Sequence, residues 1–394
     1  LDAIIRWSAL ERSIGHGDPS TRHLWWARRP LAAARAVIFA QLVDDPSSRP
    51  GEFPTEDLQR KERERLHRLI ERLVSWENVR DEGLLAEANA EILKSTDGDP
   101  PRILDPFAGG GTIPLEAQRL GLEAHASDLN PVAVLINKAL TEIPPKFSGQ
   151  PPVYPELADS EIRRWTGAEG LAADVRAYGQ WMSEQAQREI GSHYPSAAGK
   201  PVIAWLWART VPCPNPACGV AMPLVRSWWL SKKKGAEAYV VPVVTADSDS
   251  PGKQRVTFET RTGTVGAPTP DSDGTVGRRG GVCVACKSAV PLDHIRLAGR
   301  EGRMSASLMA IAAGAGADRV YLPPSEEHVR AAEVDRPDNV PTGQLPANPR
   351  DFKTPNYGIN TWADLFTNRQ LLALETFSDL VAQARSKVVE DGGT

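Results

Sequence analysis

Two acidic side chains and a glycine loop are the residues of this 394-residue chain best suited to hold a small molecule. A short apolar run ends at Asp105, and a loop with three consecutive glycines at residues 109–111 follows it. A second strand-like run, residues 122–127, leads to Asp128, which lies 23 residues after Asp105. Strand, tight loop and helix in this order predict the first half of a βαβ unit with a carboxylate at each strand end.

The loop lacks the features that two common ligands require. A phosphate-binding loop needs GK[ST] after its glycines, and no lysine is present here. A dinucleotide fingerprint would place its third glycine at Pro114, so close helix–strand packing over a pyrophosphate is not provided for. S-adenosylmethionine (AdoMet) fits better, because its cationic methionine end and its ribose both need acceptors. The alternative is an ordinary turn with surface acids.

The predicted cofactor site consists of the loop and the residues that follow each strand. We expect Thr112 to cap the helix that follows, and a Cβ at Gly109 to collide with the bound ligand. The predicted cofactor-binding residues are Asp105, Pro106, Phe107, Ala108, Gly109, Gly110, Gly111, Thr112, Asp128, Leu129 and Asn130.

All four cysteines of the chain fall into two close pairs. Four residues separate Cys213 from Cys218, two separate Cys283 from Cys286, and 64 residues lie between the pairs. Both spacings are typical of structural zinc sites, in which two close thiolates from each hairpin complete a tetrahedron. Four thiolates leave no open position, so a structural Zn²⁺ is expected, with His294 as an unnecessary spare ligand. Free buried thiols and a redox pair are the alternatives.

Cations beside tryptophans form two candidate nucleic-acid surfaces, since arginine and lysine bind phosphates and tryptophan stacks on bases. One follows Trp25 and Trp26, and the other surrounds Trp228 and Trp229. Solvated charges beside core tryptophans are the alternative in both places. The candidate residues are Arg28, Arg29, Arg226, Lys232, Lys233 and Lys234.

Two motifs resemble known methyltransferase sequences. Residues 105–112, DPFAGGGT, resemble the AdoMet-binding motif of amino-methyltransferases, and residues 128–131, DLNP, resemble the acidic motif that follows it. Residues 17–31, GDPSTRHLWWARRPL, resemble the N-terminal signature of a family of adenine-specific DNA methylases that contain a zinc ribbon. The likeness extends over nearly the whole chain, and the WWARRPLAAAR run is more specific than the glycine loop.

This resemblance implies an α/β fold: a Rossmann-like AdoMet methyltransferase sheet with an inserted, small, β-rich zinc-ribbon domain. It implies transfer of a methyl group to the N6 amine of adenine in DNA. An RNA or cytosine-N4 amino-methyltransferase is one alternative, and a non-catalytic DNA-binding or assembly module is another. Residues 17–31 and 361–371 both resemble segments that contact the methionine end of AdoMet, and the sequence does not decide between them.

Five segments follow from these motifs. We expect a helical segment (1–99), an AdoMet-binding βαβ part (100–150), a helical connector (151–200), a zinc-ribbon insertion with a possible role in target recognition (201–335), and a linker with a helix that returns to the methyltransferase domain (336–394). Residues 263–281 are rich in glycine and predict a mobile loop.

The composition constrains the class of protein, its partners and its location less strongly than the motifs do. Hydrophobic residues make up 41% and charged residues 24%, as in ordinary globular proteins, and the net charge is −4. No overall basic charge therefore attracts nucleic acid, and any DNA contact must come from local patches. The sequence contains no apolar run of about 18 residues and no signal peptide, so a cytoplasmic protein without a membrane partner is expected.

The catalytic loop of an amino-methyltransferase, Asp/Asn-Pro-Pro-Tyr/Phe, does not occur in the 394 residues. Residues 321–325 (YLPPS) have the prolines without the acceptor or the ring, and residues 354–357 (TPNY) have the ring without the double proline. The chain begins with Leu1 and ends with Gly-Gly-Thr, so both ends look cut. We expect a downstream segment or a separate chain to carry the motif, and this chain alone not to methylate DNA.

Overall fold

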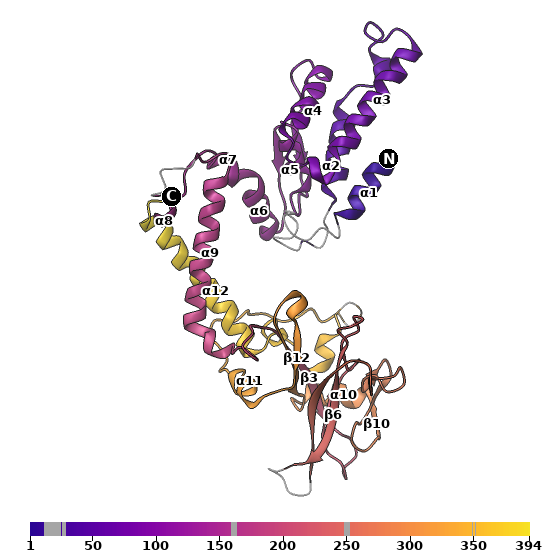
Figure 1. Ribbon diagram of the computed structural model, residues 1–394, viewed down its shortest axis with the longest axis vertical. Coiled ribbons are helices and arrows are strands. Elements are labelled where there is room, and N and C mark those ends of the chain that lie inside the picture. Colours follow the sequence, from indigo (N-terminus) through magenta and orange to yellow (C-terminus); the bar gives the residue numbers. More distant parts are fainter. Residues whose placement is uncertain (12–24, 26–28, 159–163, 248–252, 349, 351) are drawn as a thin grey trace. The chain divides into compact units, whose positions relative to one another are not determined.

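The computed structural model describes residues 1–11, 25, 29–158, 164–247, 253–348, 350 and 352–394. The protein mixes helix and sheet, with 44% of residues in helices and 18% in strands. Two compact units are present, Leu1–Arg176 and Ala177–Thr394. The division falls inside α9 (Glu169–Ile190), a long helix within the predicted helical connector 151–200 (Figure 1).

The described residues at the start of the first unit form the helices α1 (Asp2–Leu10), α2 (Leu31–Leu42), α3 (Glu56–Leu73) and α4 (Glu82–Ser95). Side chains cap two of them: Thr55 accepts the N–H of Leu58 at the start of α3, and Asp81 accepts the N–H of Leu84 at the start of α4. Apolar residues from α2, α3, α4 and the later helix α5 form one core. Its buried members are Ile38, Phe39, Leu69, Leu73, Leu84, Ala88, Ile92, Ala117, Leu120 and Leu122.

The predicted βαβ half-unit follows these helices. It consists of β1 (Ile103–Asp105), α5 (Thr112–Arg119), β2 (Ala124–Ala126) and α6 (Pro131–Asn137). β1 and β2 pair in parallel, with Leu104 opposite His125. Among the described residues no third strand joins this sheet, so a Rossmann strand order is not shown. One π-helical turn, Lys138–Glu142, and the short helices α7 (Ile143–Lys146) and α8 (Pro155–Ala158) lead to α9.

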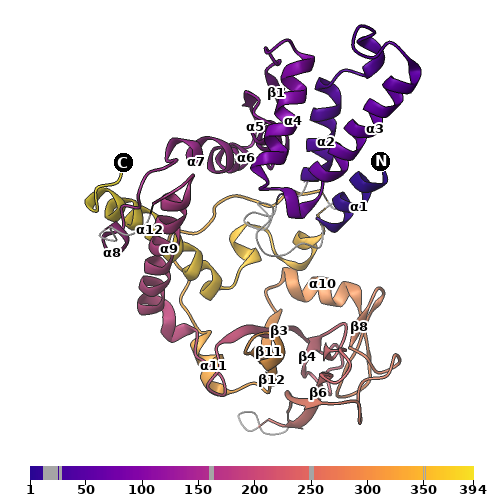
Figure 2. The ribbon, with the colours of Figure 1, turned by 45° about the horizontal axis from the view of Figure 1, so that its top comes forward.

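The second unit contains three antiparallel sheets. The largest has the order β12-β11-β3-β4, and the long pair β3 and β11 lies side by side in Figure 2. The second sheet has the order β5-β6-β7 and the third β10-β9-β8. The strands are β3 (Val202–Pro212), β4 (Ala221–Leu224), β5 (Trp229–Ser231), β6 (Ala238–Ala246), β7 (Gln254–Thr262), β8 (Val276–Gly277), β9 (Gly280–Val282), β10 (Ala289–Pro291), β11 (Ser305–Ala313) and β12 (Val320–Leu322).

Besides the end of α9, the described residues of the second unit form the helices α10 (Leu292–Arg300), α11 (Glu326–Ala331) and α12 (Asn368–Glu390). The guanidinium group of Arg369, in the first turn of α12, lies 4.4 Å from the ring centroid of Trp205 and 5.1 Å from that of Tyr194. The start of α12 is therefore held against β3 by cation–π contacts. The prediction that residues 336–394 return to the methyltransferase domain stays a prediction.

Two short strands replace part of a predicted loop. Residues 263–281 include β8 and the first two residues of β9, which pair in a hairpin with Val276 opposite Gly281. The glycine-rich composition suggested a loop because glycine weakens strands, yet here it permits close strand contact. Among the described residues no helix has the length and apolar composition needed to cross a membrane.

Candidate functional site

A hydrogen bond joins the glycine loop to the acidic residue after the second strand. The N–H of Gly109 donates to Asp128 Oδ2 at 2.9 Å, and the N–H of Asn130 donates to Oδ1 at 2.8 Å. The N–H of Ser127 donates to the carbonyl of Asp105 at 3.0 Å, so the ends of the two strands are also joined. Backbone N–H groups of Asn130 and Gly109 hold the pKa of Asp128 below its usual value, because they stabilise the ionised form.

Trp25 packs on this loop. A Cβ built on Gly109, whose φ is +49°, would lie 2.7 Å from Nε1 of Trp25. The expectation that such a Cβ meets the ligand is thus incomplete, since it would first meet the indole ring. Trp25 belongs to the segment 17–31, of which only Trp25 and residues 29–31 are described. That segment therefore contributes directly to the loop.

The cap of α5 differs from the expectation. Gly111, with φ +77°, is the N-cap residue, and Thr112 is already the first residue of the helix. The hydroxyl of Thr112 donates instead to the carbonyl of Arg29 at 3.1 Å. A left-handed conformation at the cap explains why glycine rather than threonine occupies it. Thr112 thereby connects the helix to the segment that carries Trp25.

A cavity of about 420 Å³ lies over the glycine loop, within the usual range for small-molecule sites of about 300–1,000 Å³. Asp105, Asp128, Trp25 and Arg29 line it together with loop residues. Asp105 is largely buried and accepts the N–H of Phe107 through Oδ1. Arg29, a predicted nucleic-acid residue, thus borders the cavity over the glycine loop. A second cavity, of about 300 Å³, lies beyond Asp128 and includes His125 and Asn137.

The other predicted cofactor residues differ in exposure. Ala108 is buried, whereas Phe107 is 86% exposed and Leu129 is fully exposed. The side chains of Pro106 and Leu129 have no polar group to offer a ligand. Each can therefore shape the predicted site only through its backbone, Pro106 in the turn after β1 and Leu129 in the bend after β2.

The sequence analysis did not single out Asn137. Its amide donates to the carbonyls of Gly109 at 3.0 Å and Ala133 at 2.8 Å, and its Oδ1 is buried without a hydrogen-bond partner in the described structure. Asn137 is the last residue of α6, directly before the π-helical turn. An amide inside the otherwise apolar run VAVLIN was the signal that could have identified it.

The four cysteines meet at one place in the second unit. Their Sγ atoms all lie within 4.8 Å of one another, with Cys213 to Cys286 at 3.6 Å and Cys218 to Cys283 at 3.9 Å. A tetrahedral ion with metal–sulfur bonds of about 2.3 Å requires edges of about 3.8 Å, whereas a disulfide needs about 2.05 Å. The cluster therefore fits a metal ion and does not fit two disulfides.

The pKa values of Cys213, Cys218 and Cys286 are shifted in different directions. Burial raises the pKa of Cys213 to about 12 and raises that of Cys218 as well. Hydrogen bonds from the side chain and backbone of Ser288 lower the pKa of Cys286 to about 6. The Nε2 group of His294 donates to the carbonyl of Pro212, 2.8 Å away, and His294 is not part of the cluster. Cysteine thiolates alone can therefore hold the ion.

The basic candidates of the second unit do not form one uniform patch. Arg226 is exposed, and its neighbour Trp228 is buried in the core. Lys232 lies 5.6 Å from the ring centroid of Trp229 and 3.8 Å from Asp273. Lys233 and Lys234 make no ion pair within the described part of the chain.

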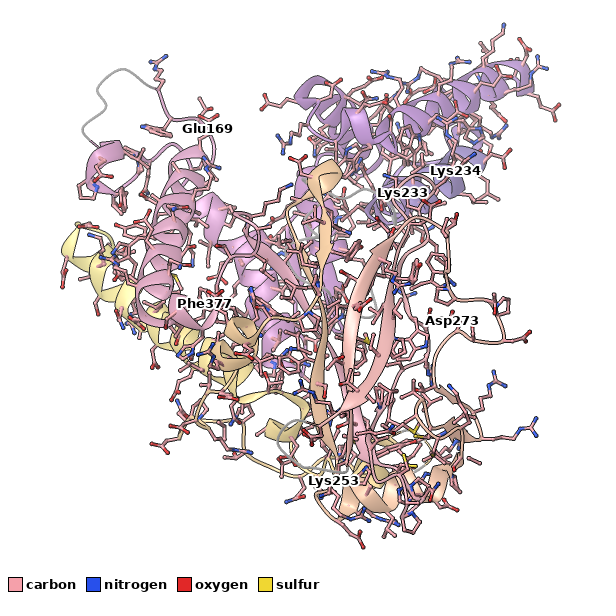
Figure 3. The ribbon with its side chains drawn as sticks, turned by 60° about the horizontal axis from the view of Figure 1, so that its bottom comes forward. Glu169, Lys233, Lys234, Lys253, Asp273 and Phe377 are labelled. Atoms are coloured by element: carbon pink, nitrogen blue, oxygen red, sulfur yellow. The ribbon has the colours of Figure 1, made fainter. Side chains whose placement is uncertain are left out.

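Figure 3 labels lysines at the two ends of the β6–β7 ladder. Lys233 and Lys234 lie at the end where β6 begins, and Lys253 lies at the opposite end. Arg28 lies outside the described residues.

The two segments with incomplete catalytic motifs both make packing or capping contacts in the second unit. Tyr357 ends a 3₁₀ turn and packs against the apolar cluster around the cysteines. Ser325 accepts the N–H of His328 and caps α11. The competing segment 361–371 belongs to the second unit, where Thr367 and Gln370 form a capping box at the start of α12.

Comparison with known proteins gives one match. A family described as "Protein of unknown function (DUF1156)" matches residues 1–69, which include Trp25 and α2. No curated protein and no solved structure matches the chain.

Proposed function

We propose that this chain forms the cofactor-binding and zinc-ribbon parts of an AdoMet-dependent methyltransferase that acts on the N6 amine of adenine in DNA. One observation carries the proposal: the Gly109–Asp128 hydrogen bond brings the glycine loop and both strand-end carboxylates to one cavity. The resemblance of residues 105–112 to amino-methyltransferases and of residues 17–31 to adenine-specific DNA methylases supports the choice of reaction.

The acceptors at the cavity suit the two polar parts of AdoMet. Oδ2 of Asp105 has no protein partner within the described residues and is available to the ammonium group of the methionine end. Each oxygen of Asp128 accepts one N–H and retains a lone pair for a ribose hydroxyl. Asp128 also lies between the two cavities, as a ribose-binding residue between the methionine and adenine parts would. When bound, AdoMet would supply an electrophilic methyl group.

Acceptors for the adenine amine and a ring that stacks on the base are expected from a segment that carries the missing catalytic motif. Leu104 in β1 is 69% exposed, and Phe107 in the following loop is 86% exposed. Parallel strands are normally covered on both faces and continued by further strands. We propose that a strand with the D/NPPY/F motif pairs beside β1, from a downstream segment or a separate chain. Zinc bound at the cysteine cluster would hold the two cysteine pairs of the zinc-ribbon part together.

Calorimetry with AdoMet tests the proposal. We expect the full chain to bind AdoMet, and Asp128→Ala to weaken binding on the order of 10- to 100-fold, because ribose hydroxyls lose a charged acceptor. Glu123→Gln is the matched control, since Glu123 is an exposed carboxylate of the same region that lines neither cavity. Undiminished affinity in Asp128→Ala would exclude the ribose assignment, and no binding by the unaltered chain would exclude the cofactor.

A further inference from the structure

Two adjacent arginines form the tip of a hairpin in the cysteine-containing region. β8 and β9 pair with Gly277 opposite Gly280, so Arg278 and Arg279 are the two residues of the turn. Both side chains are exposed, and neither makes an ion pair within the described part of the chain. Both arginines lie in the segment 263–281, whose composition predicted a mobile loop.

The tip is held in place by close backbone packing. Gly280 has φ +137°, and a Cβ there would lie 2.4 Å from the carbonyl of Val290 in β10. Glycine therefore takes the strained conformation and leaves the two turn positions to arginine. β9 ends at Val282, next to Cys283, so the metal cluster and the tip lie at opposite ends of one three-residue strand.

The surroundings of the tip favour a long anion over a small one. Arg278 and Arg279 line an open hollow of about 710 Å³ whose lining includes three glycines and no acidic residue. The hydroxyl of Thr275, another lining residue, already donates to the carbonyl of Pro223. A small anion would need enclosing donors, whereas a polymer of phosphates needs only projecting cations and room for its backbone. Guanidinium groups match phosphate oxygens with paired N–H donors.

We propose that Arg278 and Arg279 bind the phosphate backbone of double-stranded DNA, with the metal-bound cysteine cluster holding the hairpin. This inference rests on the proposed function in taking DNA as the partner. It differs from the lysine turn, where Lys232 already lies near Asp273. Each phosphate contact releases counterions, so it contributes to the salt dependence of binding regardless of base sequence.

Fluorescence anisotropy with a labelled DNA duplex over a range of salt concentrations tests the proposal on the full, zinc-loaded chain. The double variant Arg278→Ala/Arg279→Ala should lower the slope of log K against log salt by about 1.8, since each phosphate contact contributes about 0.9. The double variant Arg319→Ala/Arg385→Ala is the matched control: both arginines are exposed, lack ion pairs in the described residues and remove the same charge. Its slope should remain unchanged. Zinc content must stay at one per chain in all variants.

An unchanged slope in Arg278→Ala/Arg279→Ala, or an equal change in the control, would overturn the inference. A loss seen with duplex RNA and not with DNA would overturn it as well. AdoMet calorimetry on the same preparations separates the two proposals. If AdoMet and DNA bind but the hairpin variant behaves as wild type, only this inference fails; if the unaltered chain binds neither ligand, the proposed function also fails.

Discussion

Arg35 of α2 and Glu116 of α5 form a buried ion pair, with Nε of Arg35 2.5 Å from Oε2 of Glu116. Arg35 also donates to the carbonyl of Leu73 at the end of α3, and Glu116 accepts from Arg119. The pair joins the helix that follows the Trp25 segment to the helix that begins at the glycine loop. It therefore fixes the two parts of the candidate cofactor site to each other.

Breaking this ion pair should destabilise the first unit. We expect Arg35→Met or Glu116→Gln to cost about 3–5 kcal/mol, because a buried charge loses its partner. Glu116→Gln should cost more, because it leaves the buried Arg35 with neutral acceptors alone, whereas Glu116 in Arg35→Met keeps the charge of Arg119. Chemical denaturation combined with hydrogen exchange of α2 and α5 measures the loss. Arg63→Met, which removes the exposed pair with Asp45, is the control and should change little.

A side chain at Gly109 should displace Trp25 even without ligand. Gly109→Val places a Cβ against the indole nitrogen and strains a residue with φ +49°. We expect an altered tryptophan emission that disappears when Trp25→Phe is added, together with loss of AdoMet binding. Gly51→Ala is the control, because nothing lies within 4 Å of a Cβ there. Unchanged emission would contradict the packing of Trp25 on the loop.

One zinc ion per chain should be held by the four cysteines. Elemental analysis is expected to give a stoichiometry of one, lost in Cys283→Ser and retained in His294→Gln, since His294 contacts a carbonyl and not the cluster. Chelation should increase hydrogen exchange in β8, β9 and β10 while the first unit stays protected. Zinc retained after loss of Cys283 would contradict the four-cysteine assignment.

Zinc affinity should fall as the pH falls from 8 to 6. Burial raises the pKa of Cys213 and Cys218, so the ion must displace protons that these thiols hold at neutral pH. Titration with zinc in buffers of different ionisation enthalpy should show proton release. Affinity that does not vary with pH would mean that the thiolates are already formed before the metal binds.

AdoMet affinity should withstand a fall in pH that already weakens zinc binding. The pKa of Asp128 is lowered in the folded state, so the ionised carboxylate stabilises the loop above the unfolded pKa of about 3.8. That stabilisation is lost only as the pH falls through the lower pKa that Asp128 has in the folded protein. We therefore expect AdoMet affinity that is constant between pH 8 and 5, measured by calorimetry. A decline near pH 6 would assign the titration to another group.

Methyl transfer should require a segment that carries D/NPPY/F. Incubation of the chain with labelled AdoMet and mixed DNA is expected to give no labelled DNA, and addition of such a segment in trans should restore transfer. Transfer by the chain alone would return attention to Asn356 and Tyr357, although Tyr357 packs against the apolar cluster around the cysteines. Transfer to RNA alone would favour the alternative substrate.

Local features of the sequence determined the half-unit at residues 103–126 and the set of metal ligands. A glycine loop after a strand, an acid at each strand end, and cysteines at knuckle spacing act over a few residues, so the chain encodes them directly. Strands β1 and β2, with Asp105 at the end of one and Asp128 just after the other, appear where these patterns predict them.

Contacts between distant residues were decided by the tertiary structure alone. Trp25 on Gly109, Arg35 with Glu116, and Asn137 against the loop join positions far apart in sequence, and no spacing rule relates them. The same holds for Arg278 and Arg279, whose glycine-rich surroundings suggested a loop. Only the packing of β9 against β10 showed that glycine here allows two backbones to approach and projects both arginines at a hairpin tip.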